Sequence, residues 1–106
     1  MLEKKRLQKE ELRLQIISKV TNALNKLYQK IFFREAYIFG SLTKSHRFTG
    51  YSDIDIGFFG LRDEDFFKAL AFLSGELASD IDIIQLEGHK FKDKIIREGI
   101  RWTKKD

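Results

Sequence analysis

The segment Asp53-Ile54-Asp55-Ile56-Gly57-Phe58-Phe59 constrains the fold most, because carboxylate and isoleucine side chains alternate before the run becomes fully apolar. Alternation with a period of two is typical of a β-strand, in which successive side chains point to opposite faces. Asp53 and Asp55 therefore project from one face of the expected strand, and Ile54 and Ile56 enter the other. We expect this strand to lie in a sheet that carries an apolar core on one side and two carboxylates on the other.

Other apolar patterns predict the remaining elements. Short apolar runs predict strands at residues 34–39 and 81–86. Helical spacing predicts a first helix over about residues 3–30, a second helix with Asp63 as its N-cap, and a last helix over residues 90–102. The residues expected on the buried sides of these helices are Leu14, Ile16, Ile17, Val20, Ala23, Leu24, Leu27, Tyr28 and Ile31, then Phe66, Phe67, Leu70, Ala71, Leu73 and Leu77, then Phe91, Ile95, Ile96 and Ile100. This order predicts a single α/β or α+β domain over residues 1–106, with a small mixed sheet flanked by helices.

Composition narrows the chemistry. The chain has no Cys, which excludes disulfides, thiol catalysis and Cys-type metal sites. It has only two His, too few for a His-rich metal site. A metal would be bound by carboxylates, which favours hard cations such as Mg²⁺ or Mn²⁺. No apolar run approaches the roughly 20 residues of a membrane span, and no signal peptide is evident, so we expect a cytoplasmic protein without a membrane partner. The net charge of +4 suits a polyanionic partner or substrate.

Three features of the sequence are candidates for ligand binding or catalysis. Gly40-Ser41 follows a predicted strand, where a glycine allows close approach of the backbone and a serine can bind phosphate oxygens. Asp53 and Asp55 repel each other, and a divalent cation would offset that repulsion. Asp82 lies among isoleucines in another predicted strand, where an unpaired charge is costly. Asp80, two residues earlier and on the same face, is an alternative to Asp82.

As an ordered set, these motifs resemble the minimal nucleotidyltransferase family of the DNA polymerase β-like superfamily. The resemblance covers roughly residues 36–102 and rests on Gly40-Ser41, on Ser52-Asp53-Ile54-Asp55-Ile56 and on Asp82. It implies that Asp53, Asp55 and Asp82 are the catalytic residues and bind two Mg²⁺ ions, with Mn²⁺ as an alternative. It also implies that Gly40 and Ser41 bind the nucleotide, and Lys44 and Arg47 could add positive charge there.

One departure from the family pattern concerns the loop before Asp53. The family often has a second glycine four residues after the serine, and Ser45 stands at that place. The loop is also about one residue longer than usual, and Gly50 is a possible substitute for the missing glycine. This departure affects the path of the loop along the triphosphate and leaves the proposed metal ligands intact.

The resemblance also implies a biological role. Free-standing members of the family commonly accompany a HEPN-domain toxin and act as its antitoxin, transferring AMP from ATP to a tyrosine of the toxin. The alternatives are a nucleotidyltransferase for another protein or small-molecule acceptor, and an antitoxin that acts by docking alone with a weak active site. A basic nucleic-acid-binding domain is less favoured than either.

The remaining notable residues are expected to be structural or incidental. His46 and His89 are interpreted as surface residues, and Trp102 and the phenylalanines 58, 59, 66 and 67 as core residues. The almost wholly charged stretch over residues 3–11 is interpreted as a solvated helix end, with a docking surface for a partner as the alternative.

Overall fold

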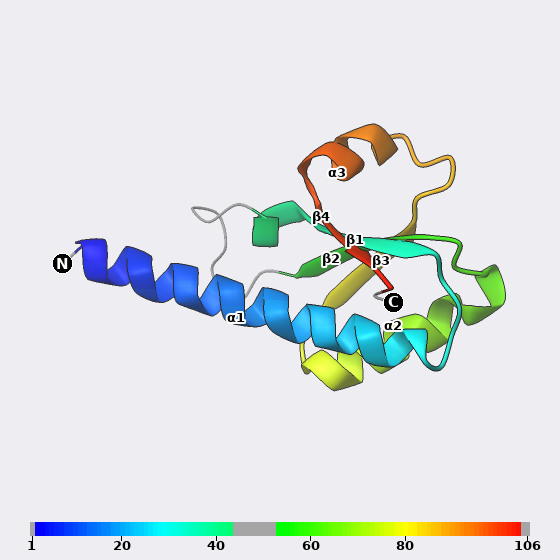
Figure 1. The fold of residues 1–106 in the computed structure, drawn as a ribbon, viewed down its shortest axis with the longest axis horizontal. Helices are drawn as coiled ribbons and strands as arrows, with labels where there is room; N and C mark the ends of the chain where they lie inside the picture. Colours follow the sequence, from blue (N-terminus) through cyan, green and yellow to red (C-terminus); the bar gives the residue numbers. More distant parts are fainter. Residues whose placement is uncertain (1, 44–52, 105–106) are drawn as a thin grey trace.

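A four-stranded mixed sheet organises the molecule (Figure 1). The computed structural model describes residues 2–43 and 53–104, with side chains from Glu10 onward. The strands β1 (Glu35–Phe39), β2 (Ile54–Phe59), β3 (Ile81–Gln85) and β4 (Ile100–Thr103) lie in the order β3-β2-β1-β4. β1 is antiparallel to both β2 and β4, whereas β2 and β3 are parallel. The expected α/β class with a small mixed sheet is confirmed.

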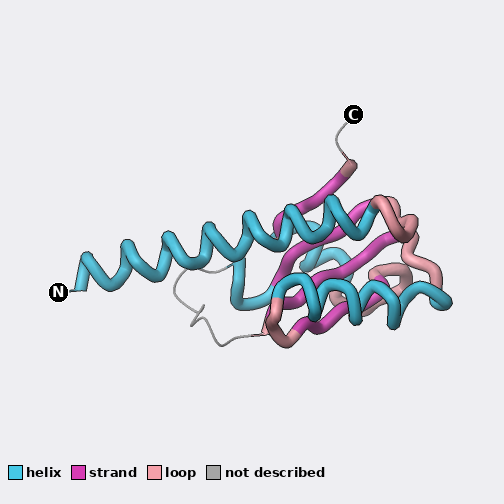
Figure 2. Tube along the Cα trace, turned by 90° about the horizontal axis from the view of Figure 1, so that it is seen from below, coloured by secondary structure: helices cyan, strands magenta, loops and turns pink. Residues whose placement is uncertain are grey.

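The helices cover both faces of the sheet. α1 (Leu2–Tyr28) and α2 (Phe66–Leu77) lie next to each other on one face, and α3 (Lys92–Glu98) lies on the other (Figures 1 and 2). The main core fills the space between α1, α2 and the sheet. Its strand residues are Ala36, Ile38, Ile54, Ile56, Phe58, Ile81, Ile83 and Trp102. Ile54 and Ile56 thus enter the core, as the alternation in β2 predicts, so the opposite face is left for the acidic residues.

The contact of the long helix α1 with the main core lies in its C-terminal half. Val20, Ala23, Leu24 and Leu27 are buried at helical spacing, but Leu14, expected on the buried side, is 53% exposed. At about 1.5 Å per residue, 27 helical residues span about 40 Å. The N-terminal half extends beyond the sheet in both views (Figures 1 and 2). Around Leu14 the helix side turned towards the rest of the molecule carries Arg13, Ile16 and Ile17, which are half-buried, so the prediction for Leu14 is wrong. In the described part of the chain, no helix has the length and apolarity of a membrane span.

The predicted last helix is wrong in its second half. Residues 90–102 form α3, then Gly99, then β4, which pairs with β1 at the edge of the sheet. Gly99 ends the helix in an extended conformation, and a Cβ atom there would lie 2.6 Å from the carbonyl oxygen of Ile95. Trp102 enters the core from β4 as expected for a core residue, but Phe91 and Ile96, predicted on the buried stripe, are exposed.

The start of the second helix also differs from the prediction. Asp63 does not cap α2, because a 3₁₀ turn η2 (Asp63–Asp65) precedes the helix. The carboxylate of Asp63 instead accepts a hydrogen bond from the side-chain amide of Gln85 at 2.7 Å, which ties the turn to the end of β3. Phe58 and Phe59 are buried as expected and Phe66 packs partly against the core, but Phe67 is 76% exposed.

Candidate active site

The parallel pairing of β2 with β3 places two carboxylates next to each other. In this register Ile54 pairs with Ile81, Asp55 with Asp82 and Ile56 with Ile83. Because the isoleucines enter the main core, Asp55 and Asp82 both lie on the α3 side of the sheet. Neighbouring strands are about 4.8 Å apart, so the two acids are adjacent.

The environment of Asp55 disfavours its charged form. Partial burial raises the pKa of the Asp55 carboxyl above its usual range, and the negative charges of Asp82 and then Asp53 raise it further. Asp53 precedes β2 and is exposed, and by alternation it projects to the same side as Asp55. The negative charges of Asp53 and Asp82 therefore both act on the carboxyl group of Asp55.

Asp80, the alternative to Asp82, has a different position. Its backbone carbonyl accepts a hydrogen bond from the Ile54 N–H at 3.0 Å, and its side chain is exposed before β3 begins. Asp82 lies on the wall of a pocket, and Asp80 does not. The geometry favours Asp82 as the acid that acts with Asp55.

Gly40 lies directly against the Asp55 carboxylate. It directly follows β1 with φ +77°, and a Cβ atom built on it would lie 2.2 Å from Asp55 Oδ2. Only a glycine fits this contact and this left-handed conformation without strain. Gly40 begins the 3₁₀ turn η1 (Gly40–Thr43), which is closed by a hydrogen bond of 2.7 Å from the Thr43 hydroxyl to the Gly40 carbonyl oxygen.

These residues share one pocket of about 700 Å³ between the sheet, η1 and α3. Residues that line it are Phe39, Gly40, Ser41, Thr43, Asp55, Asp82, Ile83, Ile84, His89, Phe91, Lys94, Ile95 and Glu98. Of the predicted site residues, Gly40, Ser41, Asp55 and Asp82 line this pocket. Lys44, Arg47, Ser45, Gly50, Ser52 and His46 lie outside the described residues.

The α3 side of the pocket was missed by the sequence analysis. His89, interpreted as an incidental surface residue, lines the pocket and accepts a hydrogen bond of 3.1 Å at Nδ1 from the Phe91 N–H. Phe91 and Lys94 lie on the same wall. The signal available in the sequence was Gly88 before the helix, a residue that takes φ +73° and allows the chain to turn back over the acidic face.

The donor set fits a hard divalent cation. Carboxylate oxygens are the ligands that Mg²⁺ and Mn²⁺ prefer, and a cation would relieve the repulsion that raises the pKa of Asp55. In the described ranges 2–43 and 53–104, however, no three His, Cys, Asp or Glu side chains are gathered closely enough to form a metal site. The chemistry of the carboxylates, rather than a preformed cluster, is what fits metal binding.

Comparisons with known proteins agree on the fold. The model of the polymerase beta nucleotidyltransferase family matches residues 18–106. No curated protein sequence matches the chain significantly. One chain of a toxin–antitoxin crystal structure with AMP-PNP is similar at TM-score 0.64 and 22% identity, over 80% of this chain and 74% of that chain.

Two further solved structures are similar over most of their length. A protein assigned as a minimal nucleotidyltransferase has TM-score 0.62 and 23% identity, over 87% of this chain and 93% of that chain. A protein from Sulfolobus solfataricus assigned as a nucleotidyltransferase has TM-score 0.61 and 25% identity, over 91% and 87%.

Proposed function

The chain belongs to the polymerase beta nucleotidyltransferase family, and we propose that it transfers AMP from ATP to a tyrosine hydroxyl of a partner HEPN toxin. In this role it is the antitoxin of a toxin–antitoxin pair. The observation that carries the proposal is the in-register pairing of Asp55 with Asp82 on the wall of a pocket that Gly40 and Ser41 also line.

Gly40 and Ser41 are proposed to bind the triphosphate. Gly40 lets the backbone approach closely, and the Ser41 hydroxyl and the N–H groups of η1 are hydrogen-bond donors for phosphate oxygens. Lys44 follows this turn in the sequence and is proposed to add positive charge to the same group.

Asp53, Asp55 and Asp82 are proposed to hold two Mg²⁺ ions, with Mn²⁺ as an alternative. When bound, such ions neutralise the triphosphate and lower the pKa of the acceptor hydroxyl. Asp55 must be ionised to act as a ligand, and its raised pKa means that it gives up its proton less readily than an ordinary aspartate.

The proposed transfer is an in-line displacement. The acceptor oxygen forms a bond to the α-phosphorus, and the bond from that phosphorus to the bridging oxygen of pyrophosphate breaks. The acceptor proton passes to solvent, and pyrophosphate leaves. The task of the chain is to hold the α-phosphorus next to the acids while the partner supplies the hydroxyl.

Support for the nucleotide and the partner comes from structural similarity. The toxin–antitoxin structure among the similar ones contains AMP-PNP, an ATP analogue, and the fold of one of its chains matches 80% of this chain.

The pocket wall also offers side chains for contact with a protein acceptor. Phe91 is 53% exposed and Lys94 is exposed, so an apolar and a cationic side chain are available there.

The test is a labelling assay with α-³²P-ATP, Mg²⁺ and the cognate toxin. The parent chain should label the toxin, and the double variant Asp53→Asn with Asp55→Asn should not, because its amides cannot replace the carboxylate ligands. The double variant Asp63→Asn with Asp65→Asn, which removes two acids from η2, is the matched control and should label like the parent. Equal labelling by the Asp53/Asp55 variant would exclude the catalytic role. Toxin neutralisation without labelling would show an antitoxin that acts by docking.

A further inference from the structure

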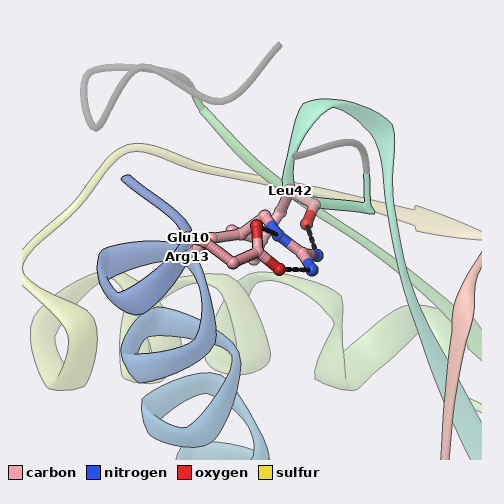
Figure 3. A network of polar contacts seen from close by, with 3 residues as sticks. All are labelled: Glu10, Arg13 and Leu42. Carbon is pink, nitrogen blue, oxygen red and sulfur yellow. Dashed lines mark hydrogen bonds and ion pairs between the residues drawn. The ribbon is translucent and has the colours of Figure 1, made fainter. Parts of the chain in front are cut away.

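Arg13, in the N-terminal half of α1, connects this helix to η1. Figure 3 shows its guanidinium between the helix and the turn. Arg13 Nη1 donates a hydrogen bond of 3.0 Å to the carbonyl oxygen of Leu42, 29 residues further along the chain. Its Nε and Nη2 donate to the two carboxylate oxygens of Glu10 at 3.0 and 2.6 Å. All three nitrogens are therefore engaged, and the side chain has one defined orientation.

We propose that Arg13, oriented by Glu10, is a positioning residue that holds η1 in the conformation that binds the triphosphate. This inference rests on the proposed function, because it assigns the phosphates to η1. It concerns a residue N-terminal to residues 18–106, the part of the chain that the family model matches.

The burial of Arg13 supports a structural connection rather than a surface charge. Its side chain is only 15% exposed, and that of Glu10 is 37% exposed. The hydrogen bonds that Arg13 donates to the Glu10 carboxylate raise the pKa of Arg13 further above its already high usual value, so the cation is permanent. A bidentate arginine–carboxylate pair has a fixed planar geometry, and this fixes the direction of the remaining Nη1 donor.

Among the described residues, three contacts hold the turn η1, and Arg13 supplies one of them. Gly40 lies against Asp55, the side chain of Leu42 is 1% exposed in the core, and the Leu42 carbonyl accepts from Arg13. None of the α1 residues whose side chains are described, from Glu10 onward, lines the pocket. The bond to Arg13 therefore directs the Leu42 carbonyl towards α1, and keeps an acceptor oxygen from turning towards the phosphates, which it would repel.

Arg13 acts through geometry and not through its charge. Its charge is balanced by Glu10, and the guanidinium reaches the outer side of the turn instead of the pocket. Loss of Arg13 should therefore weaken ATP binding while the carboxylates of Asp55 and Asp82 stay in place. A lysine cannot reproduce the fork that engages Glu10 and Leu42 together, so Arg13→Lys should restore little.

The experiment compares steady-state AMP transfer and ATP binding, in Mg²⁺, for the parent, Arg13→Ala, Arg13→Lys and Glu10→Gln. We expect Arg13→Ala to raise the KM for ATP by roughly tenfold, as loss of a hydrogen bond from a charged group does, with kcat within about twofold. Glu10→Gln keeps the Leu42 bond and should have a smaller effect. Lys26→Ala, which removes an ion pair between α1 and Glu76 of α2, is the matched control and should leave KM unchanged.

A second measurement separates this inference from the proposed function. Hydrogen exchange at the amides of Ser41, Leu42 and Thr43 should become faster in Arg13→Ala and remain as in the parent in Lys26→Ala. Unchanged exchange, or an unchanged KM with faster exchange, would overturn the positioning role. A parent chain that does not bind ATP would overturn the proposed function instead, whatever the exchange shows.

Discussion

Asp55 and Asp82 lie in register across the parallel strands β2 and β3, on the sheet face opposite the main core. Each is flanked on its strand by isoleucines that enter the core, so neither side chain can turn away without disturbing the sheet. The two negative charges are consequently held near each other and beside Gly40. A chain that carries such a repulsive pair gains from it only if something positive binds there.

The first prediction distinguishes Asp82 from Asp80. Asp82→Asn should reduce AMP transfer at least ~100-fold, because a carboxylate that ligates a catalytic cation contributes several kcal/mol to the transition state. Asp80→Asn should retain the activity of the parent, since Asp82, and not Asp80, pairs in register with Asp55, and Asp82 and Asp53 are the acids whose charges act on it. Initial rates of labelling at saturating ATP measure both. A strong loss in Asp80→Asn with little in Asp82→Asn would reverse the assignment.

The second prediction concerns the stability of the cation-free protein. Since the folded-state pKa of Asp55 is raised, ionisation of Asp55 costs more in the folded than in the unfolded chain. The stability that its protonated form provides is complete below the unfolded pKa and is lost as pH rises through the raised pKa. The Asp55→Asn variant lacks this loss. Its free energy of unfolding in urea with EDTA, relative to that of the parent, should therefore rise as the pH rises from the unfolded-state pKa of Asp55 through the raised folded-state pKa.

Addition of Mg²⁺ supplies the control for this prediction. A ligand that binds only the folded state stabilises it, so Mg²⁺ should raise the unfolding midpoint of the parent more than that of Asp55→Asn. If the difference in free energy of unfolding between parent and Asp55→Asn in EDTA stayed constant with pH, the charge of Asp55 would not destabilise the folded chain.

The sequence predicted the acidic face of the sheet because strand alternation is a local property. The pattern around Asp53 and Asp55 determines which side chains enter the core whatever the topology. Gly40 was also predictable as a point of close approach, although the sequence does not reveal that its neighbour is Asp55. The parallel register that places Asp82 next to Asp55 depends on the crossover through α2, which alternation alone does not specify.

The predictions that failed concern residues whose environment is set by distant segments. Ile100 and Trp102 continue a helical spacing from Ile95, but Gly99 and the free edge of β1 make that segment a strand. The contact of Arg13 with Leu42 joins residues 29 positions apart in different elements, so no local pattern indicates it.

The third prediction tests the contact between Gly40 and Asp55. Gly40→Ala should lose stability and activity, because the new Cβ meets Asp55 Oδ2 at 2.2 Å and φ is +77°. Gly88→Ala is the matched control, since Gly88 has φ +73° but nothing within 4 Å of its added Cβ. The left-handed conformation costs about 1 kcal/mol in both variants. Only Gly40→Ala should also lose labelling; comparable activity in the two variants would argue against a tight contact at Asp55.

The fourth prediction tests which side of α3 faces the sheet. Ile95 is 6% exposed and packs with Tyr37, Phe59 and Leu86 in a smaller buried cluster separate from the main core, whereas Ile96 is 41% exposed. Ile95→Ala should lower the free energy of unfolding by about 2–4 kcal/mol, as truncation of a buried isoleucine does, and Ile96→Ala by about 0.5 kcal/mol or less. Urea unfolding of the two single variants measures this difference between adjacent, chemically identical residues. Similar losses for both would mean that α3 is rotated and that the wall it contributes to the pocket is made of other side chains.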